Sequence, residues 1–99
     1  MSNLIENLNK TFDSRVKLGI MSAIMVNEEV NFNTLKELIN VTDGNLASHL
    51  KALEERQYLK VKKGFIGRKT NTNYTITKAG EKAFKIHIAA LEKMIKNMH

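Results

Sequence analysis

The sequence changes from a helical repeat to a strand repeat between Thr42 and Thr77, with no linker between the two parts. In the first part, Leu46, Leu50 and Leu53 fall on one face of a helix with 3.6 residues per turn. In the second part, apolar and polar residues alternate in "YLKVKK" and in "TNYTIT", which are separated by a segment with two glycines. Two such runs predict a β-hairpin. The chain must therefore fold as a domain that places a hairpin directly after a helix.

Three further helices are expected before this segment, from the helical spacing of apolar residues. The first spans Leu4 to Phe12. Asp13 or Ser14 caps the second, a short strand follows at Val30 to Phe32, and Asn33 caps the third. The residues expected to face inward from the second and third helices are Val16, Ile20, Met21, Ile24, Leu35, Leu38 and Ile39.

The remaining elements complete a fold that is mostly α-helical with a small β-hairpin, in the α+β class. Thr42 is the expected N-cap of a helix that ends around Arg56 to Tyr58, and Asp43 suits the positive end of its dipole. The hairpin tip is expected over residues 64–71, "GFIGRKTN". Thr77 caps a final helix. The apolar stripe of that helix comprises Phe84, Ile88, Leu91, Ile95 and Met98.

Length and composition favour a single globular domain over residues 1–99. The chain has 42% hydrophobic and 26% charged residues and no Pro/Gly/Ser-rich linker. It contains no cysteine, which excludes disulfides and thiolate chemistry. No apolar run approaches the roughly 20 residues of a transmembrane helix, and the N-terminus lacks the order of a secretory signal. We therefore expect a cytoplasmic protein without a membrane partner.

The charge distribution favours a polyanionic partner. The formal net charge is +6, and the segment from Lys60 to Lys69 holds five basic residues and no acidic one. Edge strands also carry lysines as protection against edge-to-edge aggregation, which explains Lys60 and Lys62. It explains Arg68 at the hairpin tip less well, whereas Arg is well suited to insertion into a minor groove. The hairpin residues expected to contact DNA are Lys62, Lys63, Arg68, Lys69, Thr70 and Asn71.

The helix that precedes the hairpin has a small, polar outer face opposite its leucines. A B-DNA major groove admits one α-helix, and small residues on the exposed face permit a close approach. The alternative for this face is simple solvation, and His49 at its flank has the alternative of packing at the helix edge. The residues of this helix expected to contact DNA are Thr42, Gly44, Asn45, Ser48, His49 and Lys51.

The segment from about Asp13 to Thr77 resembles a winged helix-turn-helix domain of the MarR/ArsR type of bacterial and archaeal transcriptional regulator. The similarity covers the stretches from Phe32 to Lys63 and from Gly67 to Gly80. Gln57 departs from the pattern, since glycine is usual before the tyrosine. The residues that match are Thr42, Leu46, His49, Leu50, Leu53, Tyr58, Leu59, Tyr74, Ile76, Thr77 and Gly80.

This resemblance implies a dimeric DNA-binding repressor or activator with a winged-helix core over residues 13–77. The recognition helix would span Thr42 to Arg56, and the hairpin from Lys62 to Asn73 would be the wing. Winged-helix domains that bind RNA or another protein remain the alternative functions. A small-molecule effector is unknown, because no residue marks a site for one.

Residues 1–12 and 78–99 carry more apolar side chains than one small core needs. We therefore expect these flanking helices to form the interface of a homodimer; the alternative is a monomer whose last helix folds back on the first. The expected interface residues are Leu4, Ile5, Leu8, Phe84, His87, Ile88, Leu91, Met94, Ile95 and Met98.

We expect no metal, no cofactor and no enzymatic activity. The three histidines lack the spacing of a metal site, and His87 has no acidic or histidine neighbour three or four residues on. The sequence contains no glycine-rich phosphate loop and no recognisable pairing of a nucleophile with a base.

Overall fold

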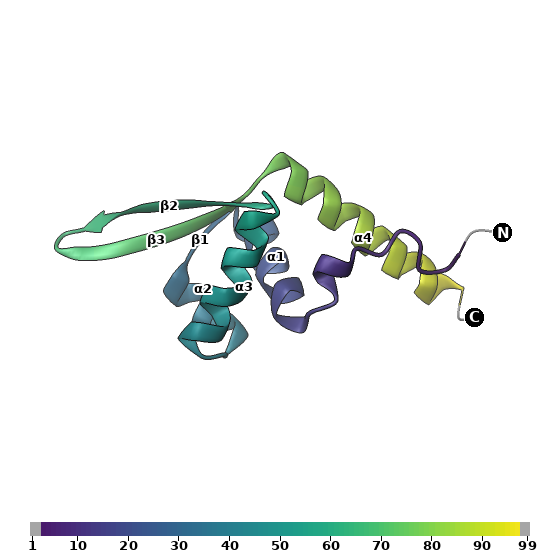
Figure 1. Cartoon of the computed structure of the whole chain (residues 1–99), viewed down its shortest axis with the longest axis horizontal. Coiled ribbons are helices and arrows are strands. Elements are labelled where there is room, and N and C mark those ends of the chain that lie inside the picture. The colour runs from purple at the N-terminus through teal and green to yellow at the C-terminus, as the bar shows by residue number, and fades with distance from the viewer. Residues whose placement is uncertain (1–2, 98–99) are drawn as a thin grey trace.

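The computed structural model describes residues 3–97, which form helices around one end of a three-stranded antiparallel sheet (Figure 1). This arrangement confirms the expected α+β class. The short expected strand is present, shifted by one residue. The elements in chain order are η1 (Lys10–Phe12), α1 (Arg15–Asn27), β1 (Glu29–Asn31), α2 (Phe32–Ile39), α3 (Asp43–Glu55), β2 (Leu59–Ile66), β3 (Lys69–Ile76) and α4 (Lys78–Lys96).

Three helices begin at the hydroxyl caps expected from the sequence. The side chains of Ser14, Thr42 and Thr77 each accept a hydrogen bond from a backbone N–H in the first turn of α1, α3 and α4. The cap of α2 was expected at Asn33, but the structure places it at Asn31. The strand β1 ends at this residue and the helix starts at once, so Asn33 already lies in the first turn.

The sheet has the order β1-β3-β2, with Val30 opposite Tyr74 and Leu59 opposite Ile76. Both strands of the hairpin are longer than expected. They remain paired to Ile66 and Lys69, so the tip is a two-residue turn and not the segment 64–71. Gly67 has a φ of +64°, which matches the positive φ required at the first central position of a type II′ hairpin turn.

The hydrophobic core lies where α1, α3 and the inner end of the sheet meet. The short helix α2 contributes one fully buried side chain, Leu35, while Leu38 is 60% exposed and does not face inward as expected. Phe32, Leu35 and Ile39 lie on the face of α2 that packs against the core, and Leu38 lies to one side of it. The buried core comprises Phe12, Ile20, Met21, Ile24, Val30, Leu35, Leu46, Leu50, Leu53, Leu59, Tyr74 and Phe84.

The expected helix from Leu4 to Phe12 is not formed. Residues 4–7 make turns, and only the single 3-10 turn η1 follows. Asparagine side chains explain the difference, because they bond to nearby backbone groups in competition with a helix. The Asn3 side chain accepts from the N–H of Ile5, and the Asn9 side chain accepts from the N–H of Thr11.

Phe12 at the end of η1 joins the N-terminal segment to α4. Its ring lies 5.4 Å from that of Phe84, 5.2 Å from His87 and 5.6 Å from Tyr58, measured between centroids. The backbone N–H of Asn9 also donates to Nδ1 of His87 at 3.0 Å. Phe84 and His87 are therefore buried within the chain itself, which differs from their expected place on a dimer surface.

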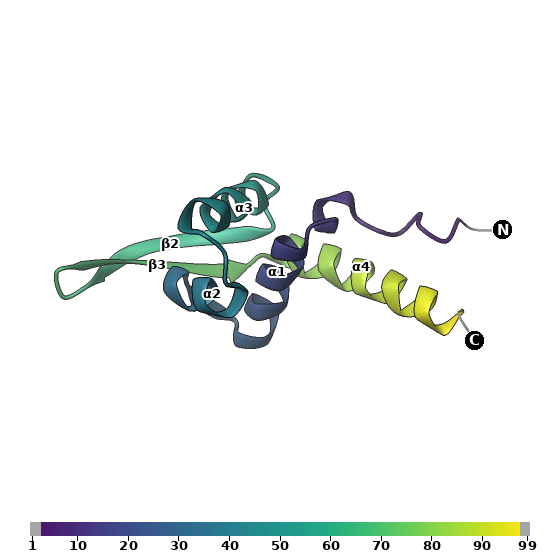
Figure 2. The ribbon, with the colours of Figure 1, turned by 90° about the horizontal axis from the view of Figure 1, so that it is seen from below.

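The molecule is elongated, with a long axis of 57 Å. The hairpin extends from one side of the helical core, while the end of α4 and the N-terminal residues extend from the other (Figure 2). The hairpin and the end of α4 therefore lie at opposite ends of the molecule.

The base of the hairpin is joined to α4 by the backbone of Tyr58. Its carbonyl accepts the N–H of Thr77 at 3.0 Å, and the Thr77 hydroxyl donates to the Gln57 carbonyl at 2.6 Å. Gln57 has a φ of +62° and closes α3 in the turn where glycine is usual. A Cβ on Gly80 would overlap the carbonyl of Tyr58, so α4 can approach this closely only with glycine there.

We predict that Gly80→Ala lowers the free energy of unfolding by about 1–3 kcal/mol, because the added methyl group must push α4 away from Tyr58. Gly64→Ala is the matched control, since a Cβ at that position meets nothing within 4 Å. Urea denaturation of both variants measures the effect. Equal stabilities would contradict this account of the junction.

We also predict that acid weakens the fold through His87. Burial lowers its pKa below the usual 6.5, and the Asp13 carboxylate opposes this shift in part. As the pH falls through about 6.5, the unfolded chain takes up a proton that the folded chain resists, so the free energy of unfolding decreases.

The variant His87→Gln keeps a hydrogen-bond acceptor and cannot be protonated, so its denaturation midpoint should fall less between pH 7.5 and 5.5. Burial and Lys17 also lower the pKa of His49, so His49→Gln serves as the parallel variant that retains the His87 effect. An unchanged pH dependence in His87→Gln would refute the role of this ring.

Candidate nucleic-acid interface

The exposed face of α3 consists mainly of small or polar side chains. Its leucines are buried against the core, as expected, and Ser48 lies on the opposite side of the helix. Gly44, Asn45 and Lys51 lie on either side of Ser48, and all four are exposed to solvent. A Cβ on Gly44 would meet nothing within 4 Å, so the backbone itself is accessible there. The structure therefore brings together four of the six residues expected to contact DNA from this helix.

Thr42 and His49 are held differently. The hydroxyl of Thr42 accepts the N–H of Asn45 at 3.2 Å and is engaged as the helix cap. His49 is half-buried at the edge of α3, and its Nδ1 lies 2.9 Å from Nζ of Lys17 on α1. Because an ammonium group only donates, Nδ1 accepts and the ring proton sits on Nε2. For His49 this geometry favours the alternative of packing at the helix edge.

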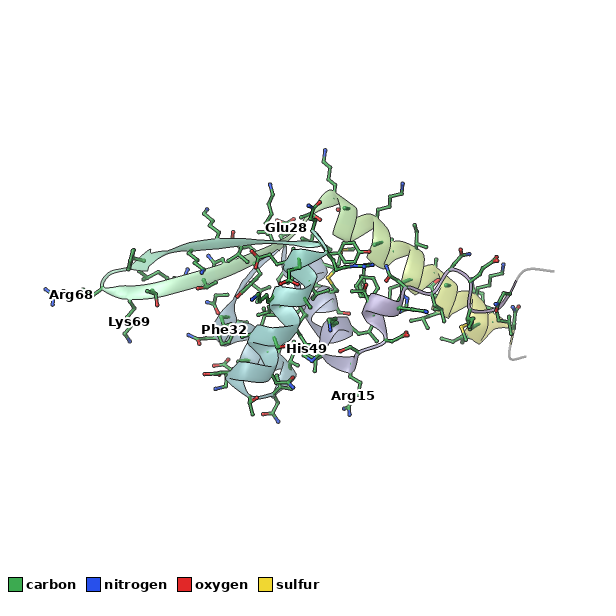
Figure 3. The ribbon with its side chains drawn as sticks, viewed as in Figure 1. Arg15, Glu28, Phe32, His49, Arg68 and Lys69 are labelled. Atoms are coloured by element: carbon green, nitrogen blue, oxygen red, sulfur yellow. The ribbon has the colours of Figure 1, made fainter. Side chains whose placement is uncertain are left out.

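The hairpin carries cations to the outer end of the molecule. Figure 3 shows Arg68 at its tip with Lys69 beside it. Lys62, Lys63 and Thr70 are also exposed, whereas Asn71 is half-buried and donates to the side chain of Asn73. All the residues expected to contact DNA from the hairpin thus lie on β2, β3 and the turn between them.

The cations of the hairpin have no carboxylate partner within the described part of the chain. The ion pairs found in residues 3–97 are Lys36–Asp43 at 2.6 Å and Lys85–Glu81 at 2.7 Å. The first joins α2 to the first turn of α3 and so supports the orientation of the exposed helix. The wing is therefore a source of positive potential that no carboxylate of the described residues neutralises by an ion pair.

The expected dimer residues differ in their exposure. Leu4, Ile5 and Ile95 are 58–64% exposed at the end of the molecule away from the hairpin. Phe84 and His87 are internal, as described above, and Met98 lies outside the described residues. The half-buried residues are Leu8, Ile88, Leu91 and Met94.

Several exposed apolar side chains were not expected from the sequence. Phe65 and Ile66 lie near the hairpin tip, because β2 continues three residues beyond its expected end. Leu38 and Val26 are exposed on the helical side. The two-residue period of a strand could have placed Phe65 on the same face of β2 as Leu59 and Val61, if the strand had been extended beyond Lys63.

Residues 3–97 contain neither a cluster of metal ligands nor a membrane-spanning helix. No group of three His, Asp or Glu side chains there is placed to hold a metal ion. None of the helices formed by these residues combines the length and the apolar character needed to cross a membrane.

Together these features define a class of protein. The helices α2 and α3 form a helix-turn-helix with a thin exposed second helix, and the following hairpin extends past the core as a wing (Figure 1). This is a winged helix-turn-helix domain. The model of a family described as winged helix DNA-binding domain matches residues 16–95. The chain belongs to this family, which confirms the resemblance found in the sequence.

Individual relatives agree with this assignment. The chain is 40% identical over 89 residues to an uncharacterized protein of Methanocaldococcus jannaschii, covering 90% of this chain and 97% of that one. A transcriptional regulator homologue from Pyrococcus horikoshii superposes with a TM-score of 0.78 at 26% identity, covering 94% and 97% of the two chains. A MarR-family transcriptional regulator from Silicibacter pomeroyi shares the fold, with a TM-score of 0.64 at 14% identity, covering 97% and 66%.

Proposed function

We propose that this protein is a homodimeric transcriptional regulator that binds double-stranded DNA in a sequence-dependent manner. Helix α3 would occupy the major groove and the wing would contact the backbone or the adjacent minor groove. The observation that supports this most directly is the exposed face of α3, with its small and polar side chains, next to a wing whose cations form no ion pair among residues 3–97. Membership of a DNA-binding family supports the same function.

The chemistry of the α3 face is suited to reading bases. Asparagine can pair with adenine through two hydrogen bonds, and serine or lysine can donate to purine acceptors in the major groove. Asn45, Ser48 and Lys51 would supply these contacts. The absence of a side chain at Gly44 would let the start of the helix approach the groove closely.

The wing would contribute affinity without base selection. Lysine and arginine side chains release counterions from DNA when they neutralise phosphates, and this term depends on salt but not on sequence. The residues suited to this role are the exposed cations Lys62, Lys63, Arg68 and Lys69.

The end of the molecule away from the wing would form the dimer contact. Leu4 and Ile5 face solvent beside the C-terminal half of α4, where Ile95 is also exposed. A groove of about 240 Å³, whose lining includes Leu4, Ala90 and Met94, separates the two segments. A second copy would cover these apolar groups. A two-fold axis there would present two recognition helices about 34 Å apart, or a multiple of this, to a palindromic site.

We predict that Arg68→Ala and Lys69→Ala each weaken binding to all duplexes and reduce the slope of log K against log[salt] by about 0.9. Lys82→Ala is the matched control, because Lys82 is an exposed cation on α4. Fluorescence anisotropy with random duplex DNA at several salt concentrations measures the slope. A wild-type protein that does not bind duplex DNA, but binds RNA or an acidic protein, would overturn the proposed function.

Replacing Asn45 should change specificity instead. We predict that Asn45→Ala costs about 1–3 kcal/mol at one base pair of a selected site and leaves the salt slope unchanged. Selection of bound fragments from random duplexes, repeated with the variant, identifies that base pair. A uniform loss of affinity for every sequence would exclude base readout by Asn45.

The dimer is tested by Ile95→Glu, which places a charge on the proposed interface. We expect sedimentation at micromolar concentration to show a dimer for the wild type and a monomer for the variant. Leu38→Glu is the control, since Leu38 has the same 60% exposure but lies on α2. A wild-type monomer under these conditions would remove the homodimer from the proposal.

A further inference from the structure

The wing ends in two large apolar side chains that its own chain does not cover. Phe65 is 74% exposed and Ile66 is 68% exposed, directly before the Gly67–Arg68 turn. Neither belongs to the hydrophobic core or to the apolar residues that pack against it. Folding therefore does not explain why these positions are apolar.

Phe65 and Ile66 lie on opposite faces of the ribbon. Successive residues of a strand alternate between faces, so Phe65 continues the face of Leu59, whereas Ile66 points to the other side. The partners across the hairpin are Thr70 and Lys69, respectively. The end of the wing is consequently apolar on both sides.

The surroundings of this pair are cationic. Lys63 precedes it on β2, Arg68 forms the turn and Lys69 begins β3, and neither the turn nor the two hairpin strands contain an acidic residue. An apolar contact framed by cations is complementary to a surface that has both apolar groups and phosphates.

We propose that Phe65 and Ile66 form an apolar wedge that enters the minor groove of duplex DNA. This inference rests on the proposed DNA-binding function. The two walls of a minor groove expose deoxyribose C–H groups between the phosphates, so they contact both faces of an entering tip. A protein surface would contact one face and leave the other apolar residue in water. Proteins that insert Phe or Ile into the minor groove partly unstack a base step and bend the duplex.

The wedge predicts an effect on affinity that is separate from the effect of charge. Phe65→Ala should weaken binding by about ten-fold or more, because the buried apolar area is lost. The slope of log K against log[salt] should stay the same, since no cation has been removed. Lys69→Ala should also weaken binding, but with a reduced slope, because it removes a cation. Phe65→Leu, which remains apolar, should retain most of the affinity.

A second readout tests insertion directly. Fluorescence energy transfer between dyes at the two ends of a bound duplex reports bending, and 2-aminopurine within the site reports unstacking. Both signals should appear with the wild type and decrease with Phe65→Ala and Ile66→Ala. Val26→Ala, at an exposed apolar position in α1, should change neither signal.

The outcomes separate this inference from the function on which it rests. If the wild type fails to bind duplex DNA, the proposed function itself is wrong. If it binds, but Phe65→Ala and Ile66→Ala bind equally well, only the wedge is refuted. If these variants keep DNA affinity and instead dissociate an oligomer or release a protein partner, the tip is a protein contact and the wedge is likewise refuted.

Discussion

The backbone of Tyr58 lies against the first turn of α4, and the directions of both ends of the molecule depend on this contact. The Tyr58 carbonyl accepts the N–H of Thr77, and Gly80 leaves room for the close approach. The hairpin leaves this junction in one direction and α4 in the other (Figure 2). A change in the packing here would rotate the wing relative to α4, even though every other helix kept its own hydrogen bonds.

The N-terminal segment adds a second restraint at the same place. Asn9 donates its backbone N–H to His87 and its side-chain amide to the hydroxyl of Tyr58 at 3.1 Å. Phe12 fills the space between these rings. One short segment thus connects α4 to Tyr58, the residue directly before the hairpin. In the proposed dimer, the distance between two recognition helices would depend on this set of contacts, because α4 would carry the interface.

Most of the fold could be predicted from local signals, whereas the burial of individual side chains on α4 could not. The hydroxyl caps and the leucine face of α3 depend on residues within one or two turns, so the sequence indicates them directly. The burial of Phe84 and His87 depends on contacts between distant segments. His87, for example, is buried because Asn9, 78 residues away, donates to it. Periodicity within one helix contains no information about such a partner.

The same distinction applies to the candidate interface. Exposure of Gly44, Asn45 and Ser48 follows from their position opposite the leucines, whereas the pairing of His49 with Lys17 requires the packing of α3 on α1. In the wing, the sequence indicated the cationic residues correctly, but the predicted tip of residues 64–71 was longer than the observed two-residue turn. With a two-residue turn, Phe65 and Ile66 become strand residues with defined faces.

A wing with cations and apolar residues at its tip combines two interactions that respond differently to salt. Phosphate contacts weaken as the salt concentration rises, because the release of counterions into a more concentrated solution is less favourable. Burial of apolar area is little affected at moderate salt. Cations alone would hold the wing to any duplex and let it slide. An apolar tip gains free energy only where the groove admits it, and that depends on how easily the local sequence opens or bends. Under the proposed function, the wing would therefore contribute to sequence preference through deformability, at positions where α3 touches no base.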